Sequence, residues 1–321
     1  MTMKKNDMKF TDCAKLLLEH EAIMLITHKN PDGDTLGSAA ALCSALRRKG
    51  KHAYLYANPQ VGGLMRPYVE EFFAPEGSEE MFDYYVAVDV ADEKLFPKGF
   101  SFPVDLCIDH HEVNTHYAPQ ELIRDDRSSC GEIILDLIKV MHKTPTAQEA
   151  TLLYIAVSTD TGCFQYLNTN ARTLATAAEL VRYGADNGKI STDFFRKVSA
   201  ARLRLEGAIY ASLSFHRDDK VVVSVITQKM LFEAGAKEEE DLDDLAGLAG
   251  RLRDGLVSVT IRELKNGESR VSVRSGPTVS SSEICGVFGG GGHAMAAGCT
   301  IPAPPAKAKE MLLAVIDEIM Q

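Results

Sequence analysis

The sequence lacks the cysteine patterns that mark disulfide scaffolds and zinc ribbons. Its seven cysteines are odd in number and scattered, and no CxxC pair occurs. This disfavours both classes and predicts a reducing, cytoplasmic compartment. The chain of 321 residues, 45% hydrophobic and 25% charged, can bury a large core without cross-links.

Long apolar runs are absent as well. The N-terminal stretch starts with a few basic residues, but acidic residues interrupt it before an apolar core of signal-peptide length develops. No apolar run approaches the roughly 20 residues that span a bilayer. We therefore expect no membrane association.

Positive charge is in short supply, since the formal net charge is -10. Long nucleic acids are gripped mainly by Lys and Arg on phosphates, so the sequence disfavours a long nucleic acid as partner. A small anionic substrate remains compatible, because bound divalent cations can reverse the sign of the local field.

The first half of the chain alternates apolar runs with amphipathic stretches. The pattern predicts strands over Ala22–Thr27, His52–Ala57, Tyr84–Val90 and Val104–Ile108. It predicts helices over Thr35–Lys49, Ser129–His142 and Thr146–Val157, the last with a capping box from Thr146 to Glu149. This alternation is typical of an α/β fold with a doubly wound, mainly parallel sheet and helices on both faces.

The second half has a different pattern. A charged helical segment, 186–208, is predicted to link a first domain, 1–185, to a smaller mixed α/β domain, 209–321. In the smaller domain we expect strands over Lys220–Thr227, Gly255–Leu264 and Glu268–Ser275. We also expect a solvated helix that begins in Glu238–Asp244 and an amphipathic helix over Pro304–Met320.

Acidic and histidine residues cluster where predicted elements of the first half end. Five aspartates and three histidines take part: His28, Asp32, Asp34, Asp89, Asp109, His110, His111 and Asp160. Ligands of parallel sheets bind at the carboxyl ends of the strands, so we expect these side chains to share one edge. Gly33 is expected to let the loop turn so that both neighbouring aspartates face one cleft.

So many carboxylates cannot all stay ionised in a low-dielectric cleft without cations. A mixed oxygen and imidazole set suits Mn²⁺, and Mg²⁺ or Co²⁺ less specifically. Two ions about 3.5–4 Å apart would clamp a phosphoryl group and activate a water. Singly, each residue is better explained as a helix cap, a surface histidine or a turn. Their joint occurrence at successive element ends favours metal.

Four segments in order resemble the motifs of DHH phosphoesterases: His28–Ser38, Val86–Asp92, Asp109–His111 and Thr159–Phe164. Gly289–Gly298 resembles the signature of the associated C-terminal domain, so the resemblance spans most of the chain. Within the family, the chain is most similar to bacterial nano-RNA and pAp phosphatases, and close to stand-alone cyclic-dinucleotide phosphodiesterases.

The resemblance implies a role for each clustered residue. One Mn²⁺ would be held by His28 and Asp32, with Asp89 bridging to the second ion. The second ion's own ligands would be Asp34, His110 and Asp160. Asp109 would orient neighbouring ligands, and His111 would face the scissile phosphate as electrostatic stabiliser or proton donor.

The second half offers candidates for holding the substrate: Arg274, Ser275, Gly290, Gly291, Gly292 and His293. Arginine presents a planar fork of donors to phosphate, and successive glycines can offer backbone N–H groups as an anion nest. A tight glycine turn beside a surface arginine is the plainer explanation. No Gly-Lys-Ser/Thr follows the run, so it is not a Walker loop.

The resemblance implies hydrolysis of short RNA, pAp, linear pApA or cyclic dinucleotides. The alternatives are a pyrophosphatase or polyphosphatase, a RecJ-like exonuclease on long DNA, and a non-catalytic nucleotide sensor. The lack of a basic tract disfavours the exonuclease, the resemblance of the GGGGH domain to nucleotide-binding members disfavours the pyrophosphatase, and the complete ligand set disfavours the sensor. The sequence leaves open a homodimer.

Overall fold

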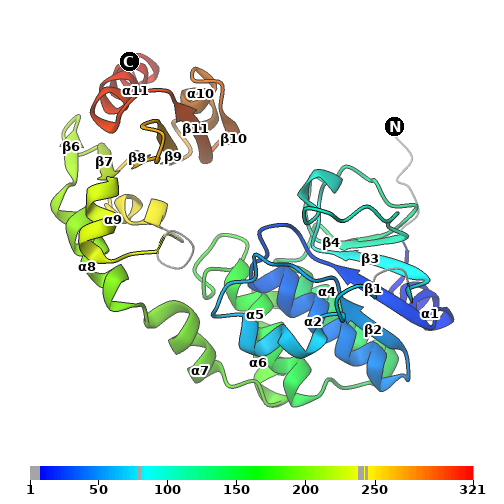
Figure 1. Cartoon of the computed structure of the whole chain (residues 1–321). Helices are drawn as coiled ribbons and strands as arrows, with labels where there is room; N and C mark the ends of the chain where they lie inside the picture. The colour runs from blue at the N-terminus through cyan, green and yellow to red at the C-terminus, as the bar shows by residue number, and fades with distance from the viewer. Residues whose placement is uncertain (1–7, 79–80, 238–241, 243–244, 321) are drawn as a thin grey trace. The chain divides into compact units, whose positions relative to one another are not determined.

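A computed structural model describes residues 8–78, 81–237, 242 and 245–320. The chain forms two compact units, Met1–Lys197 and Val198–Gln321. Figure 1 shows the elements of each unit, and each is described here by itself. Among the described residues, none of the helices combines the length and apolar character needed to cross a membrane.

The first unit is built on a five-stranded sheet in which all neighbouring strands run parallel, in the order β2-β1-β3-β4-β5. The strands are β1 Ala22–Ile26, β2 His52–Leu55, β3 Tyr84–Val88, β4 Leu106–Asp109 and β5 Gln120–Ile123. The chain runs outward from β1 to β2 and then returns to β3 on the other side of β1. This reversal creates a switch point between β1 and β3, where open parallel sheets bind ligands.

Helices cover one face of this sheet. The α-helices of the unit are α1 Phe10–Glu19, α2 Gly33–Arg48, α3 Arg66–Val69, α4 Cys130–His142, α5 Ala147–Asp160, α6 Ala171–Arg182 and α7 Asn187–Ser191. Alternate strand residues such as Ile23 and Leu25 pack with buried residues of α1, α2, α4 and α5 in one core. The residues between them, such as Met24 and Ile26, face the other side of the sheet.

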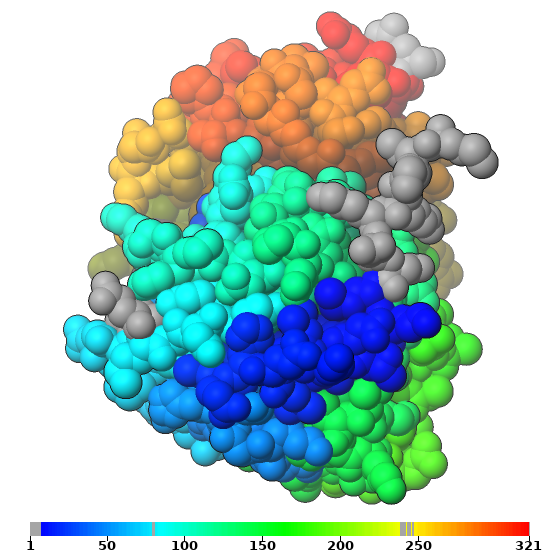
Figure 2. Space-filling model, turned by 90° about the vertical axis from the view of Figure 1, so that its right-hand side faces the viewer, coloured from blue at the N-terminus to red at the C-terminus, as the bar shows by residue number. Residues whose placement is uncertain are grey.

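The second face is covered by aromatic side chains instead of a long helix. Met24, Ile26 and Tyr85 pack there against Phe82 and against partly buried rings from Phe96 to Phe102. Figure 2 shows these connecting segments in cyan at the surface of the unit. The α/β class with a parallel sheet is confirmed, but the expectation of helices on both faces is wrong, because aromatic side chains cover the second face.

The predicted elements of the first unit are confirmed to within a few residues, including the capping box from Thr146 to Glu149. Four of the described α-helices and strands were not predicted: α1, α3, β5 and α6. The strand β5 has four residues and an edge position, so its sequence carries little periodicity. The predicted helix over 186–208 is not continuous. It consists of α7, a π-helical turn Thr192–Arg196 and, after a break, α8 Ala200–Ala211, which Ser199 caps.

The second unit carries a six-stranded mixed sheet in the order β10-β11-β9-β8-β7-β6, with β7 and β8 parallel and the other pairs antiparallel. The strands are β6 Ser214–His216, β7 Val221–Ile226, β8 Val257–Glu263, β9 Ser269–Ser275, β10 Gly291–His293 and β11 Ala296–Ile301. The helices are α8, α9 Gln228–Ala234, α10 Ser281–Gly286 and α11 Pro305–Ile319.

One face of the six-stranded sheet packs on α10 and α11 around Ile284, Leu312 and Ile316. Three predicted strands and the C-terminal helix are confirmed, whereas β6, β10, β11, α9 and α10 were not predicted. The predicted helix start in Glu238–Asp244 lies outside the described residues apart from Leu242.

Close helix packing in the first unit depends on Gly37. A Cβ added to Gly37 of α2 would collide with the carbonyl oxygen of Leu152 and crowd Ala156, both on α5. Because α2 carries Asp34 in its first turn and α5 ends at Asp160, this contact also sets the spacing of two site residues.

We predict that Gly37→Ala lowers the free energy of unfolding by about 1–3 kcal/mol, the usual range for overpacking. Gly207→Ala is the matched control, because α8 leaves open space around the added methyl group. It should stabilise the chain by up to about 1 kcal/mol. Denaturant unfolding measures both variants, and a Gly37→Ala protein as stable as the parent would contradict the packing argument.

Candidate metal centre

The eight predicted residues of the first unit lie together at the carboxyl edge of the parallel sheet. His28 and Asp32 follow β1, Asp89 follows β3, and Asp109 ends β4. The ligand atoms of seven of them, all but Asp109, form three overlapping groups, each within 4.8 Å: His28, Asp32 and Asp89; Asp34, His110 and Asp160; and Asp89, His110 and His111. Asp89 belongs to the first and third groups and His110 to the second and third, so these two residues connect all three.

The environment of Asp89 is energetically unfavourable for an ionised carboxylate. Its side chain is 4% exposed, and its φ of 61° lies in the left-handed region that non-glycine residues avoid. Among the described residues, its Oδ1 finds no hydrogen-bond partner. The nearest ring nitrogens are His110 Nε2 at 3.4 Å and His111 Nδ1 at 3.6 Å. A buried, unsatisfied carboxylate oxygen is unfavourable, so a bound cation fits this position.

Asp32 holds the start of α2. One of its oxygens accepts the backbone N–H groups of Asp34 and Thr35 at 3.0 and 3.1 Å, and the other lies 3.6 Å from His28 Nε2. Burial raises the pKa of Asp32, but its interaction with His28 and these N–H groups outweigh burial and lower it.

Gly33 differs from the prediction. It is the first residue of α2 and does not adopt a left-handed conformation. A Cβ at this position would collide with the side chain of Thr159, the residue before Asp160. Gly33 is therefore needed because α2 and the end of α5 approach closely, and the flexibility of a turn is not the reason.

Asp34 is fixed by three donors. Its oxygens accept the N–H groups of Cys130 and Gly131, which open α4, at 2.7 and 3.0 Å, and the hydroxyl of Ser38 at 3.0 Å. Burial, followed by the negative charge of Asp89, raises the pKa of Asp34 well above its ordinary value. The carboxylate is thus oriented by a helix N-terminus but still requires positive charge nearby.

His110 lies among three carboxylates. Its Nδ1 is 3.4 Å from the carbonyl oxygen of Arg127, which can only accept, so Nε2 is left to face the aspartates. Nε2 lies 3.6, 3.4 and 3.8 Å from Asp34, Asp89 and Asp160. Burial lowers the pKa of His110, but these carboxylates outweigh burial and raise it to about 10. The site strongly favours positive charge, which divalent cations would supply.

Asp109 orients His111. It is fully buried, and its Oδ1 lies 2.8 Å from His111 Nδ1. A carboxylate only accepts, so Nδ1 carries the proton and Nε2 is the nitrogen left for a substrate. Oδ2 accepts the side-chain amide of Asn114 at 2.6 Å. The hydrogen bond to Asp109 is the main cause that raises the pKa of His111.

Three asparagines support the centre and were not predicted. Besides Asn114, Asn58 donates to the carbonyl oxygen of His28 at 3.0 Å, and Asn168 donates to that of Asp160 at 3.1 Å. Asn168 follows the Thr159–Phe164 motif closely, which is the one signal that could have drawn attention to it. A side-chain amide in a loop has no periodicity that distinguishes it from other turn residues.

The substrate candidates of the second unit fall into two kinds. Arg274 and His293 are exposed, and both pair in register with Ala296 of β11, so they lie on one face of the sheet. Ser275 donates to the carbonyl oxygen of Val279 at 2.6 Å, and so it supports the local loop.

The glycine run forms β10 and the turn before it. A Cβ on Gly290 or Gly292 would collide with the backbone of β11, whereas Gly291 faces open space. Two of these glycines are therefore required by hairpin packing. Gly291 and His293 are exposed and are not subject to this requirement.

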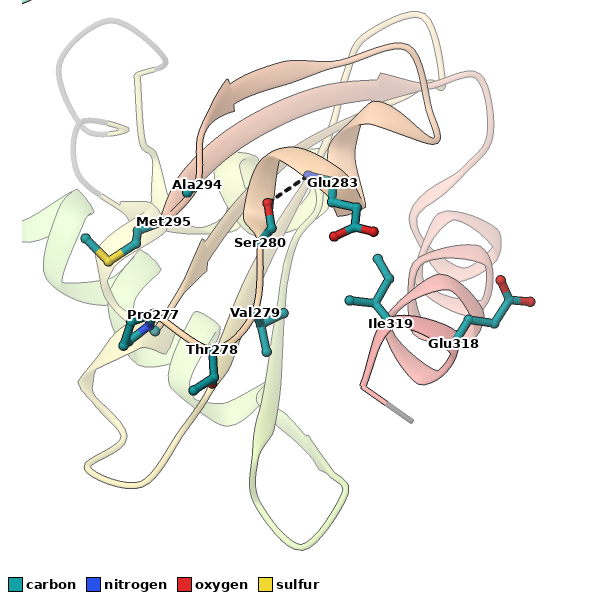
Figure 3. Close-up of a pocket in the computed structure, with 10 residues that line it drawn as sticks. Pro277, Thr278, Val279, Ser280, Glu283, Ala294, Met295, Glu318 and Ile319 are labelled. Carbon is teal, nitrogen blue, oxygen red and sulfur yellow. Dashed lines mark hydrogen bonds between the residues drawn. The ribbon is translucent and has the colours of Figure 1, made fainter.

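Figure 3 shows a pocket of about 730 Å³ beside this hairpin. Its lining includes Ser280, Met295 and the carboxylates Glu283 and Glu318, but neither Arg274 nor His293. Two carboxylates repel phosphate, so this pocket does not suit an anionic substrate. A smaller cavity of about 180 Å³ is lined by Arg274 and Ser275.

We predict that Asn114→Ala weakens the binding of divalent cations, or lowers the reaction rate because His111 is less well oriented. The chain should remain folded. Groups that orient ligands typically contribute 10–100-fold to metal affinity or activity, and about 10-fold is expected here because Asn114 acts through Asp109. Calorimetric titration with Mn²⁺ and the reaction rate measure both effects. Asn266→Ala, in the exposed turn between β8 and β9, is the control. If affinity and rate both match the parent, Asn114 does not support the centre.

Two family models match the chain: the DHH family, N-terminal domain, over residues 22–157, and the DHHA1 domain over residues 218–321. The bifunctional oligoribonuclease and PAP phosphatase NrnA of Thermus thermophilus is 33% identical over 282 residues, covering 87% of this chain and 84% of that protein.

Solved structures share the fold. An exopolyphosphatase-related protein from Bacteroides fragilis superposes with a TM-score of 0.85 at 21% identity, covering 96% of each chain. RecJ of Thermus thermophilus in complex with Mn²⁺ gives a TM-score of 0.54 at 15% identity, covering 96% of this chain and 55% of RecJ. Motifs, site geometry, family models and the NrnA relative agree, and the chain belongs to the DHH family of phosphoesterases.

Proposed function

We propose that this protein hydrolyses short nucleotide phosphoesters at a centre of two Mn²⁺ ions. The observation that carries the proposal is the buried carboxylate of Asp89, which faces both sets of ligands. Its Oδ1 has no hydrogen-bond partner among the described residues and lies 3.4 Å from His110 Nε2, and its Oδ2 lies 3.9 Å from His28 Nε2. One ion would be held by His28 and Asp32 and the other by Asp34, His110 and Asp160, with Asp89 common to both. Mn²⁺ is favoured over Mg²⁺ or Co²⁺ by the mixed imidazole and carboxylate donors.

Bound divalent cations would supply Lewis acidity at the phosphoryl oxygens and an activated water. The chain's own contribution to proton transfer is His111. Asp109 fixes its Nδ1 proton and favours the imidazolium, so Nε2 can donate a hydrogen bond or a proton to the phosphate or the leaving oxygen. With 47% of its side chain exposed, His111 is accessible to a substrate.

The substrate class is proposed from two supports. The NrnA relative is named for oligoribonuclease and PAP phosphatase activity. The net charge of -10 disfavours a track along a long nucleic acid. Arg274 and His293 of the second unit are the proposed nucleotide contacts. Short RNA, pAp and pApA are the proposed substrates, and cyclic dinucleotides, polyphosphate and pyrophosphate are the alternatives that an assay must include.

The test measures release of phosphate or mononucleotide from pAp and pApA with Mn²⁺. We expect turnover that a chelator abolishes and Mn²⁺ restores. Asp89→Asn should lower kcat by more than about 100-fold, the upper range for groups that merely orient ligands, because it removes the shared charge. Asparagine tolerates a left-handed φ, so this variant tests charge without adding backbone strain.

Asp317→Ala is the control for loss of a carboxylate, since Asp317 forms a surface ion pair with Arg217. Its rate should equal that of the parent. Near-parental turnover by a folded Asp89→Asn protein, or full turnover after exhaustive metal removal, would refute the two-ion centre. Hydrolysis of polyphosphate or pyrophosphate in preference to nucleotides would refute the substrate assignment alone.

A second prediction concerns Arg274 and substrate length. Arg274→Ala should raise KM for pAp and pApA about 10-fold, in line with loss of one charge-assisted hydrogen bond, and should change a chromogenic phosphodiester much less. Arg270→Ala, four residues earlier on the same face of β9, controls for a general loss of positive charge. Equal losses on both kinds of substrate would assign Arg274 to the fold. Efficient digestion of long RNA or DNA would overturn the preference for short substrates.

A further inference from the structure

The loop after α5 is locally strained. Gly162, Cys163 and Phe164 follow one another with φ values of 55°, 56° and 66°, all in the left-handed region. Two of the three carry side chains, for which this conformation is unfavourable. A Cβ on Gly162 would collide with the ring of Tyr166, so the glycine is required where that ring rests on the backbone.

Several contacts hold this strained loop to the end of α5. Thr161 is fully buried, and its hydroxyl donates to the carbonyl oxygen of Val157 and accepts the N–H group of Phe164 at 3.2 Å. The Phe164 ring packs on Tyr154 with centroids 5.9 Å apart. The N–H group of Tyr166 donates to the carbonyl oxygen of Thr161 at 3.0 Å. The loop therefore has one defined shape, with Phe164 as its inward anchor.

Tyr166 is accessible although its ring is positioned. It is 54% exposed, and the next residue, Leu167, is 91% exposed. Single exposed apolar residues are common on protein surfaces and need no explanation. Here, however, backbone strain and a required glycine place the ring, which an accidental surface residue would not need.

The ring belongs to the loop that directly follows Asp160, one of the candidate metal ligands. Gly162, on which it rests, is two residues from Asp160, so their Cα atoms are within about 8 Å. Asn168, two residues beyond Tyr166, returns to Asp160 and donates to its carbonyl oxygen at 3.1 Å. The loop thus carries an exposed aromatic ring and is joined at both ends to Asp160, a residue of the candidate metal centre.

We propose that Tyr166 is a nucleobase-binding residue, on which the base of the bound nucleotide stacks while its phosphate occupies the metal centre. The inference rests on the proposed function and deepens it. Stacking on an aromatic ring tolerates every base, because each has a π face. Stacking would also make the metal centre, which binds only the phosphate, prefer nucleotides to other phosphoesters. Leu167 would extend the apolar surface.

The kinetic test compares pAp with the same ribose bisphosphate lacking its base. Tyr166→Ala should raise KM for pAp roughly 10- to 100-fold, the range reported by alanine substitution of stacking residues, and leave the abasic compound unchanged. Tyr166→Phe keeps the ring and should retain parental values. Phe232→Ala removes an exposed ring from α9 and serves as the control. Equal losses on both compounds, or a Phe variant as impaired as the Ala variant, would overturn the proposal.

A binding test separates this inference from the proposed function. The sequence contains no tryptophan, so Tyr166→Trp introduces a single indole. Its fluorescence should be quenched on titration with AMP in Mg²⁺, and ribose 5-phosphate should quench it much less. Equal responses, or none with AMP, would overturn the stacking role even in a protein that hydrolyses pAp. Failure of the parent to hydrolyse any nucleotide, together with selective quenching by AMP, would refute the proposed function and leave nucleobase binding supported.

Discussion

The chemistry of the first unit depends on the buried carboxylate of Asp89. It sits at the switch point of the parallel sheet, nearly buried, on a left-handed residue, with one oxygen lacking a hydrogen-bond partner among the described residues. Each of these features is unfavourable alone. Together they are compatible with a stable fold because positive charge can be placed between Asp89 and its neighbours. The raised pKa of His110 shows the same preference for positive charge.

The packing of the surrounding helices determines where the candidate ligands lie. Gly33 and Gly37 let α2 approach α5, while the opening N–H groups of α4 hold Asp34. The carboxylates of Asp34 and Asp160 thus come from different helices. Backbone N–H groups hold the first, and close packing of α2 on α5 together with the Asn168 amide positions the second. This rigidity is what preorganises a centre for an ion with defined coordination.

The sequence predicted the parallel sheet and the grouping of the eight polar residues, because apolar strands followed directly by Asp or His are visible without a structure. It did not predict that aromatic side chains cover the second sheet face, since those rings lie in irregular segments. It also missed Asn58, Asn114 and Asn168, whose roles depend on contacts between distant residues. The purpose of Gly33 was misjudged because the constraint comes from Thr159, 126 positions away along the chain.

The separation of the site residues along the chain has a consequence for assembly. They extend from His28 to Asp160 and come from loops and helices at the ends of three parallel strands and of α5, so no short segment contains a complete centre. Parallel pairing forms slowly because distant segments must meet before contacts stabilise them. We therefore expect a cation to bind the folded unit and not the unfolded chain, and so to stabilise the fold after it has formed. The unfolding temperature of the first unit should rise with cation concentration, because the cation binds only the folded state. A unit without these ligands should show no such rise in unfolding temperature.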